Sequence, residues 1–281
     1  MNVLVIDSNY FCYKAYYAVG GLAYEGVETG IYYGFFNQLI TAARMTKPDN
    51  IIFCWDSRQS ERKKIFPEYK KKEEQTEEEK EMWGKVFKKF RYLQKKILPE
   101  LGFNNIFIQR GYESDDLIAK YVLNRPKGHI VYIASGDNDL LQLLDDRCFI
   151  IKDNTFYGKQ DFINDTQLSS PRDWIEVKKI AGCTSDKVPG VPDVKEKRAI
   201  QYLLGQMNPK TKTYKKIKEH KELILFNEKL VLLPFKKTID INDNITKNAF
   251  SMKQFLRMCR EYGFHSFRIE ERKEEIRNLF N

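Results

Sequence analysis

The stretch NVLVIDSNY, residues 2–10, decides the fold, because an apolar run of strand length ends directly in an acid, Asp7. Three further apolar runs of strand length follow at residues 51–55, 106–108 and 130–134, separated by segments long enough for helices. This alternation of strand and helix signals predicts an α/β fold with a largely parallel central sheet and helices on both faces.

Acidic residues follow each of the four apolar runs. They are Asp7, Asp56, Glu113, Asp115, Asp116, Asp137 and Asp139. Because the carboxyl ends of parallel strands line one edge of a sheet, we expect these carboxylates to gather in one place. A single strand-end Asp is more often a helix cap or a turn residue, so the prediction depends on the whole group.

Carboxylates gathered in this way repel one another, and bound divalent cations remove the repulsion. The donors are oxygens, and no His or Cys pair stands at metal-ligand spacing, which favours Mg²⁺ or Mn²⁺ over zinc. Two such ions about 3.5–4 Å apart are a common arrangement for phosphodiester cleavage. The sequence therefore predicts a two-metal centre at this edge of the sheet.

The composition is typical of a globular chain with an anionic partner. Of 281 residues, 42% are hydrophobic and 31% charged, and the net charge of +9 favours nucleic acid as that partner. Five cysteines without a CxxC pair exclude a disulfide framework and a zinc knuckle, and they favour a reducing cytoplasm. No apolar run reaches the ~18 residues of a membrane span, and the amino terminus lacks the pattern of a secretory signal.

Two stretches carry most of the excess positive charge. Residues 58–99 hold 14 Lys and Arg against 8 Glu, and residues 195–218 hold eight Lys and Arg against Glu196 alone. The first predicts a solvated helical excursion from the sheet and the second a basic surface, although charge runs are usually just solvated faces. A helix start is indicated at Ser170, so we place a domain boundary near residue 167.

Six motifs occur in a fixed order along the chain. They are VLVIDSNY at 3–10, FCWDSR at 53–58, FPEYK at 66–70, GYESDD at 111–116, SGDNDLLQL at 135–143 and GCTSDKVPGV at 182–191. With these motifs the chain resembles the 5′-nuclease superfamily, in particular flap endonucleases and 5′-to-3′ exonucleases such as free-standing bacteriophage enzymes and the amino-terminal domain of bacterial DNA polymerase I. The resemblance implies a PIN-like catalytic domain over 1–167 with a helical arch near 58–99. It also implies a helical duplex-binding region over 168–281 with a helix-three-turn-helix near 180–205.

The resemblance also implies roles for the acids. The ligands of a first ion match Asp7, Asp56, Glu113 and Asp115, and the acids around a second ion match Asp116, Asp137, Asp139 and Asp186, with Asp115 between the two. Lys70, which follows Tyr69, matches an arch lysine that positions and stabilises the scissile phosphate. We therefore expect Lys70, Asp115 and Asp139 to take part in catalysis.

The resemblance implies DNA contacts outside the acidic edge. In the hairpin these are Gly190, Lys195, Lys197 and Arg198, and the family hairpin often holds a monovalent cation such as K⁺. Asp193 and Lys195 stand where the family pattern has glycines, and a positive φ is unfavourable for them, which disfavours the K⁺ site. Tyr69 in the FPEYK motif and Lys14 on the first expected helix are further candidates for DNA contact. The aromatic residues of the first helix either stack on unpaired bases or, more often, belong to the core, and they are Tyr10, Phe11, Tyr13, Tyr16 and Tyr17.

Cys183 is the largest departure from the family pattern, which has Asp here as a principal ligand of the second ion. A thiol is a poor Mg²⁺ ligand. Two outcomes stay open from the sequence: a weakened second site, or a neutral replacement in which Asp139, Asp186 and water complete the site.

The sequence and the resemblance together predict a divalent-metal-dependent 5′-nuclease. Its expected substrates are branched or 5′-ended DNA and RNA primers paired to DNA, and its expected state is a cytoplasmic monomer without membrane contact. A PIN-like ribonuclease is a related alternative, which the arch and hairpin segments disfavour. A branched-DNA-binding protein with weakened catalysis is a second alternative, which Cys183 leaves open.

Overall fold

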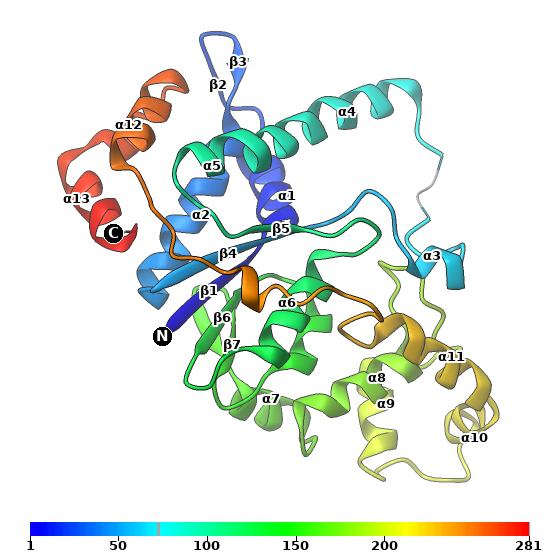
Figure 1. Ribbon diagram of the computed structural model, residues 1–281. Helices are drawn as coiled ribbons and strands as arrows, with labels where there is room; N and C mark the ends of the chain where they lie inside the picture. Colours follow the sequence, from blue (N-terminus) through cyan, green and yellow to red (C-terminus); the bar gives the residue numbers. More distant parts are fainter. Residues whose placement is uncertain (72–73, 281) are drawn as a thin grey trace.

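The computed structural model describes residues 1–71 and 74–280 and has a six-stranded sheet at its centre (Figure 1). The sheet order is β5-β4-β1-β6-β7-β8. The strands are β1 (Asn2–Asp7), β4 (Asn50–Trp55), β5 (Ile106–Ile108), β6 (Ile130–Ala134), β7 (Cys148–Lys152) and β8 (Thr155–Tyr157). All neighbours pair in parallel except β7 and β8, so the prediction of a largely parallel sheet is confirmed.

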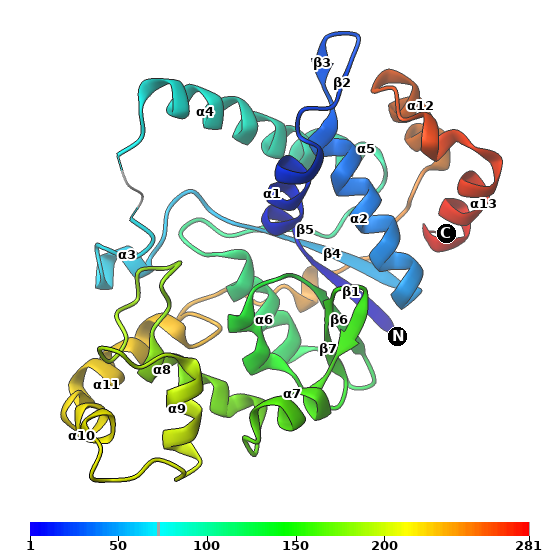
Figure 2. The same cartoon turned by 180° about the vertical axis from the view of Figure 1, so that it is seen from behind.

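Both faces of the sheet are covered by helices, as Figures 1 and 2 show from opposite sides. Leu4 and Ile6 of β1 pack in the cluster formed with α1 (Ser8–Val19) and α2 (Gly30–Thr46). Val3 and Val5 pack on the other face in the cluster formed with α6 (Ser114–Asn124). Because successive strand residues point to opposite faces, the continuous apolar run VLVI is what a strand buried on both sides requires.

An arch of helices leaves the sheet after β4. It contains α3 (Arg62–Ile65), α4 (Glu77–Tyr92), the π-helical turn η1 (Leu93–Ile97) and α5 (Leu98–Glu100). The predicted excursion over 58–99 therefore has helical structure, except that residues 72–73 lie outside the described part. A short hairpin, β2 (Ala23–Tyr24) and β3 (Val27–Glu28), lies near the carboxyl-terminal end of α4 (Figure 1).

Aromatic packing holds α4 against the first helix. The Tyr13 ring lies 5.3 Å from Phe90 and 5.9 Å from Trp83, measured between ring centroids. Phe11 is buried, whereas Tyr17 is 73% exposed. Most of the first-helix aromatics therefore serve the core or the arch, and Tyr17 alone among them is strongly exposed.

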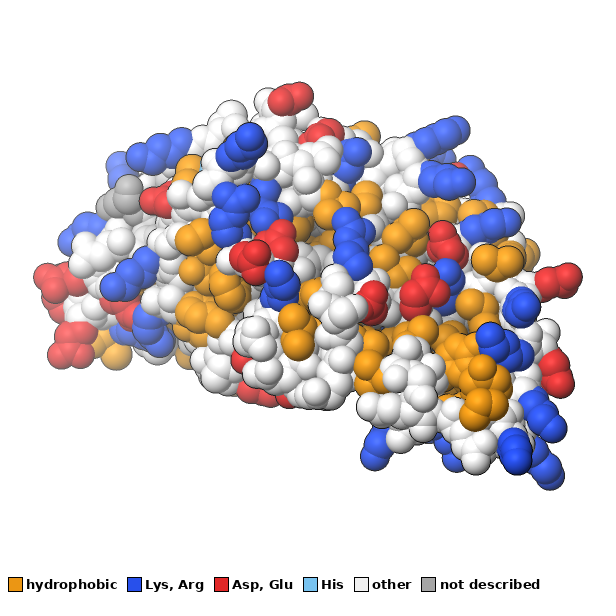
Figure 3. Space-filling model, turned by 90° about the horizontal axis from the view of Figure 1, so that it is seen from below, with side chains coloured by type: hydrophobic (Ala, Val, Ile, Leu, Met, Phe, Trp, Pro, Cys, Tyr) orange, Lys and Arg blue, Asp and Glu red, His pale blue; other side chains and the backbone are white. Residues whose placement is uncertain are grey.

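Short helices make up most of the chain after the sheet. They are α7 (Lys159–Thr166), η3 (Pro171–Asp173), α8 (Trp174–Ala181), α9 (Glu196–Leu203), α10 (Lys212–Glu219) and α11 (Lys221–Val231). The Ser170 hydroxyl accepts a hydrogen bond from Arg172 N, as the predicted helix start requires. Seen from below, Lys and Arg side chains are frequent at the end of the molecule that α9–α11 form (Figure 3).

The hairpin between α8 and α9 depends on glycine. A Cβ atom at Gly190 would lie 2.0 Å from the carbonyl oxygen of Ala181, so no other residue fits this close approach. Asp193 has a φ of +66°, a conformation that Asp adopts more readily than most residues, whereas Lys195 is extended with a φ of −95°. Of Asp193 and Lys195, only Asp193 therefore has a left-handed backbone.

The last segment returns to the first half of the chain. It comprises η4 (Asn242–Asn244), α12 (Met252–Glu261), η5 (His265–Arg268) and α13 (Glu270–Phe280), with α12 and α13 beside α2 (Figure 1). Asn105 Nδ2 donates to Thr246 O at 2.8 Å, and Ala249 N donates to Gly102 O at 2.8 Å. No helix in the described ranges combines the length and apolarity needed to cross a membrane.

Candidate active site

The acids that end β1 and β4 are joined through the start of α6. Ser114 N donates to Asp56 Oδ1 at 2.8 Å, and the Ser114 hydroxyl donates to Asp7 Oδ1 at 3.1 Å. Ser135, after β6, donates its hydroxyl to Asp7 Oδ2 at 2.8 Å. Three neighbouring strands thus deliver their carboxyl ends to one place, as parallel geometry requires.

Burial and mutual repulsion raise the pKa values of these acids. Burial, with Asp56 close by, raises the pKa of Asp7 to about 7. Burial, followed by Asp137 and Asp7, holds the pKa of Asp115 well above its usual range. Asp115 Oδ1 is buried and has no hydrogen-bond partner within the described part of the chain. Such a group of carboxylates favours a bound cation, because a cation removes the repulsion that the protons otherwise relieve.

The arch places Tyr69 and Lys70 among the acids. Lys70 Nζ donates to Glu113 Oε2 at 2.8 Å and lies 3.6 Å from Asp186 Oδ2. The Tyr69 hydroxyl lies 3.0 Å from Glu113 Oε2 and 3.1 Å from Asp186 Oδ2, so it can donate to either carboxylate. Although burial opposes the Lys70 charge, Glu113 and the other acids hold its pKa well above the ordinary value. Lys70 is therefore a cation poised at the acidic edge.

The arch also covers a pocket of about 400 Å³ beside these groups. Asp56, Glu113 and Lys70 line it together with Tyr13 and Arg91. The pocket therefore extends from the acidic edge to α4. Its lining offers a polyanion the cations Lys70 and Arg91 and the ring of Tyr13.

A second group of potential ligands stands where the sheet meets the α8–α9 hairpin. Within the described residues, the ligand atoms of Asp139, Cys183 and Asp186 lie within 4.8 Å of one another. Burial, followed by Asp137, raises the pKa of Asp139 to about 6. Burial, followed by Asp139, raises the pKa of the Cys183 thiol. The thiol therefore stands among the acids of this group.

Lys178 is a residue of this site that the sequence reasoning missed. Its Nζ lies 2.9 Å from Asp139 Oδ1 and 3.4 Å from Glu196 Oε1, and the side chain is 6% exposed. Although burial opposes the charge, Asp139 and Cys183 hold the pKa of Lys178 above its ordinary value. Its position four residues after the buried Trp174 is a helical spacing that predicts burial, and a buried lysine requires an acidic partner.

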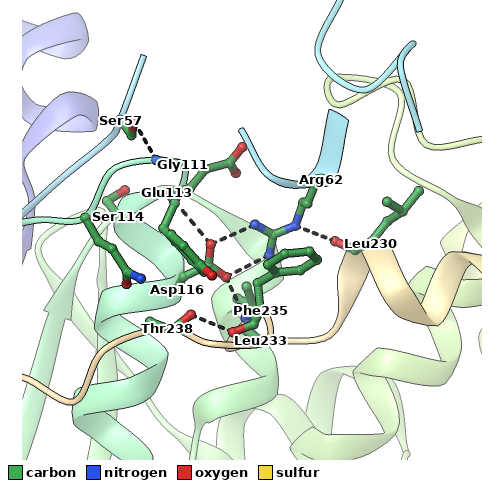
Figure 4. A network of polar contacts seen from close by, with 12 residues as sticks. Ser57, Arg62, Gly111, Glu113, Ser114, Asp116, Leu230, Leu233, Phe235 and Thr238 are labelled. Carbon is green, nitrogen blue, oxygen red and sulfur yellow. Dashed lines mark hydrogen bonds and ion pairs between the residues drawn. The ribbon is translucent and has the colours of Figure 1, made fainter. Parts of the chain in front are cut away.

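Asp116 differs from the other acids of the site in that an arginine bonds both of its oxygens. The side chain is fully buried, and Arg62 bonds both of its oxygens, at 2.7 and 2.8 Å (Figure 4). Phe235 N and Glu113 N donate to the same carboxylate at 2.8 and 3.2 Å. An arginine thus balances its charge, as Lys178 does for Asp139.

The predicted DNA-contacting residues fall into two groups near the acids. Lys195 and Lys197 line a pocket of about 580 Å³ together with Asp137, Asp139 and Cys183.

Lys14 and Tyr10 line another pocket, of about 540 Å³, beside Ser135 and Gly136. Arg198 is engaged within the hairpin, since its Nη1 donates to Asp193 O at 2.8 Å. The carbonyl of Asp193 is therefore already occupied by a cationic donor.

Comparison with known proteins identifies relatives over most of the chain. Residues 2–167 match the sequence profile of the 5′-3′ exonuclease, N-terminal resolvase-like domain. A 5′-3′ exonuclease of Mycoplasmopsis pulmonis is 31% identical over 267 residues, which cover 89% of this chain and 85% of that protein. The DNA polymerase I of Mycobacterium bovis is 29% identical over 72% of this chain, which matches 23% of the polymerase's length.

Two solved structures have a similar fold. The bacteriophage T5 5′-exonuclease with bound zinc ions aligns with a TM-score of 0.68 at 22% identity, over 83% of this chain and 90% of that one. The catalytic core of Rad2 in complex with a DNA substrate aligns with a TM-score of 0.54 at 16% identity, over 93% of this chain and 87% of that one.

Proposed function

The chain belongs to the 5′-3′ exonuclease family, and we propose that it hydrolyses phosphodiester bonds of DNA near 5′ ends and single-strand–duplex junctions with the help of two divalent ions. The observation that carries the proposal is the meeting of strand-end carboxylates with a lysine from the arch, Lys70, at 2.8 Å from Glu113. RNA primers paired to DNA are included as substrates, and the monomer is the proposed working form.

The donors fit hard divalent ions. Asp7, Asp56, Glu113 and Asp115 would hold the first ion, and the unpartnered buried oxygen of Asp115 is the group that most needs one. Asp137, Asp139, Cys183 and Asp186 would surround the second. Mg²⁺ or Mn²⁺ held there would lower the pKa of an attacking water and neutralise charge on the phosphate.

The protein's own residues position the scissile phosphate. Lys70, in the arch, is attached to the α8–α9 hairpin through a hydrogen bond from its backbone N to Asp186 O at 2.9 Å, so its ammonium group stays near the acids. There it would stabilise charge that develops on the phosphate. Tyr69 would keep Glu113 and Asp186 in place through its hydroxyl. Lys178 would balance the charge of Asp139 and orient that carboxylate.

The hairpin and the basic surface would bind the duplex. Lys195 and Lys197 border the pocket that holds Asp139, which would put duplex phosphates next to the acids. Gly190 would serve through the close backbone approach that it permits. Lys14 would contact a phosphate on the other side of the acidic edge. The proposal contains no K⁺ ion, since Arg198 already bonds the Asp193 carbonyl.

A cleavage time course tests the proposal. Labelled 5′-flap DNA, nicked duplex and an RNA primer on DNA would be incubated with Mg²⁺, Mn²⁺ or EDTA, for the parent protein and for Asp139→Asn. We expect cleavage near the junction with either metal and none in EDTA. Asp139→Asn should abolish cleavage but bind DNA as tightly as the parent or more tightly, because it removes a charge that repels phosphate.

Four results would contradict the proposal. Cleavage in EDTA, or full activity of Asp139→Asn, would exclude the two-metal mechanism. Tight binding of flap DNA without cleavage in either metal would favour a DNA-binding protein with weakened catalysis. Cleavage of single-stranded RNA in preference to all three duplex substrates would favour a ribonuclease.

A further inference from the structure

Arg62 is an arginine of the arch base that lies buried next to the candidate active site. It is 2% exposed, although it belongs to a stretch of otherwise solvated basic residues. Its Nη1 and Nη2 bond the two oxygens of Asp116, and its Nε donates to Leu230 O at 2.9 Å (Figure 4). Three segments that are distant in sequence therefore meet at one guanidinium group: α3, α6 and the end of α11.

Two backbone donors bond the same carboxylate. Glu113 N, at the cap of α6, donates to Asp116 Oδ2, and Phe235 N, after α11, donates to Asp116 Oδ1. The carboxylate thus accepts four hydrogen bonds, two from Arg62 and two from the backbone. A fully bonded buried pair of this kind holds its partners in one geometry, because each broken bond leaves a buried charge or donor without a partner.

Aromatic rings connect the guanidinium group to the catalytic candidates. The Arg62 guanidinium carbon lies 4.8 Å from the centroid of the Phe235 ring and 5.9 Å from that of Tyr69. Tyr69 in turn lies within hydrogen-bond distance of Glu113 and precedes Lys70. The Arg62 guanidinium group therefore lies beside the ring of Tyr69, the residue before Lys70. On its other side it bonds Asp116, which accepts a hydrogen bond from Glu113 N.

The segment after α11 is tied to the second group of acids as well. Gln142, which is 1% exposed, donates to Asp139 O at 2.8 Å and to Val231 O at 3.1 Å. Its Oε1 accepts from Leu233 N at 3.0 Å. The same short stretch that bonds Arg62 and Asp116 thus also holds the 3-10 helix η2 (Asn138–Leu143), which carries Asp139.

We propose that Arg62 and Asp116 act as a positioning pair, which fixes the base of the arch against α6 and the segment after α11 so that Lys70 and Glu113 meet at the scissile phosphate. Neither residue contacts the substrate or a metal ion in this proposal. It rests on the proposed nuclease function, whose own supporting observations involve neither Arg62 nor Asp116. Asp116, which the family resemblance implies among the acids around the second ion, is not a metal ligand in this proposal, because four hydrogen bonds already engage its two oxygens.

Two variants test the pair. Arg62→Lys keeps a positive charge for Asp116 but loses the two-pronged contact and the bond to Leu230 O. The double variant Arg62→Met/Asp116→Asn removes both charges, so no unpaired charge stays buried, and it keeps an acceptor oxygen for the backbone donors. The measurements are the single-turnover cleavage rate at saturating 5′-flap DNA, the Kd for that DNA with Ca²⁺, the Mg²⁺ concentration for half-maximal rate, and the melting temperature.

We expect the rate at saturating DNA to fall at least about tenfold in Arg62→Lys and about 10²-fold in the double variant, because small displacements of reacting groups cost about that much. The Kd for DNA and the Mg²⁺ requirement of Arg62→Lys should stay within about twofold of the parent values. A loss of rate without a loss of binding is the signature of positioning.

Arg125 offers a matched control. It bonds Asp145 at 2.6 and 2.8 Å and donates to Val122 O at 2.6 Å, so it makes the same kinds of contact beyond the opposite end of α6. Arg125→Met should lower the melting temperature and leave the saturating cleavage rate unchanged.

Three outcomes would overturn the inference. The parental rate in Arg62→Lys would show that the geometry of the pair does not matter. A parental rate in the double variant would show that the pair serves stability alone. An equal loss of rate in Arg125→Met would show that any arginine–carboxylate pair beside α6 has this effect. If the parent protein itself does not cleave DNA, the proposed function fails; if the parent cleaves and the Arg62 variants cleave equally well, only the positioning role fails.

Discussion

Replacing Asp7 by Asn should stabilise the metal-free protein at neutral pH. In the unfolded chain this carboxyl group ionises at its ordinary pKa of 3.8, whereas burial and the neighbouring Asp56 raise the folded-state pKa to about 7. Between these values the folded state binds more protons than the unfolded state. The protonated carboxyl group therefore contributes stability that is fully present below pH 3.8 and is lost as the pH rises through about 7.

The size of the effect follows from the shift. Each pKa unit corresponds to about 1.4 kcal/mol, so the rise from 3.8 to about 7 amounts to a loss of roughly 4 kcal/mol for the metal-free protein above neutrality. Asn carries no charge at any pH and keeps the acceptor oxygen that Tyr10 N and the Ser114 hydroxyl use. The variant should thus escape this loss while it keeps the local hydrogen bonds.

Urea unfolding at a series of pH values measures the difference. In EDTA, the free energy of unfolding of the parent should fall between about pH 5 and pH 8, and Asp7→Asn should fall less steeply, with the gap approaching about 4 kcal/mol at the upper end. Mg²⁺ should restore the parent at high pH by binding the ionised carboxylates, and it should restore Asp7→Asn much less. Asp243→Asn, at an exposed position of η4, is the control and should follow the parent.

The reasoning would be refuted by a parent protein whose stability in EDTA rises from about pH 5 to pH 8. It would also be refuted if Asp7→Asn followed the parent with the same slope, because the raised pKa of Asp7 would then make no contribution to the stability of the folded state.

Three further predictions concern the reaction and its substrate. Lys70→Ala should lower the single-turnover rate far more than it weakens duplex binding, as measured by rapid quench and by anisotropy; weaker binding at an unchanged rate would make Lys70 a general phosphate contact. Cys183→Asp should shift the Mg²⁺ activation curve to lower concentration and Cys183→Ser should not, and identical curves for all three proteins would mean that other ligands already complete the second site. Lys197→Ala should weaken duplex binding and reduce the slope of log Kd against log salt by about 0.9, whereas an unchanged slope would place this lysine away from the phosphates.

Much of the fold could be predicted because its signals are local. The continuous apolar runs at β1, β4, β5 and β6 and the acids that follow them are readable within a few residues, and the structure places these strands in one parallel sheet. The strands β7 and β8 were not predicted, since Cys148–Lys152 and Thr155–Tyr157 are short and partly exposed and their pattern is weak. The return of α12 and α13 to α2 was not predicted either, because no local pattern states which surface a helix covers.

The sequence by itself determined which residue types stand at the edge of the sheet, and the tertiary structure alone decided how each of them is paired. Asp115 and Asp116 are adjacent acids at the start of one helix, yet Asp115 keeps an unpartnered oxygen while Asp116 is bonded by an arginine 54 positions earlier. Lys178 likewise meets Asp139 only because α8 packs beside the 3-10 helix η2, which follows β6. The charge and the protonation of a buried carboxylate depend on the groups within a few ångströms of it, and those groups come from whichever segments the fold brings together.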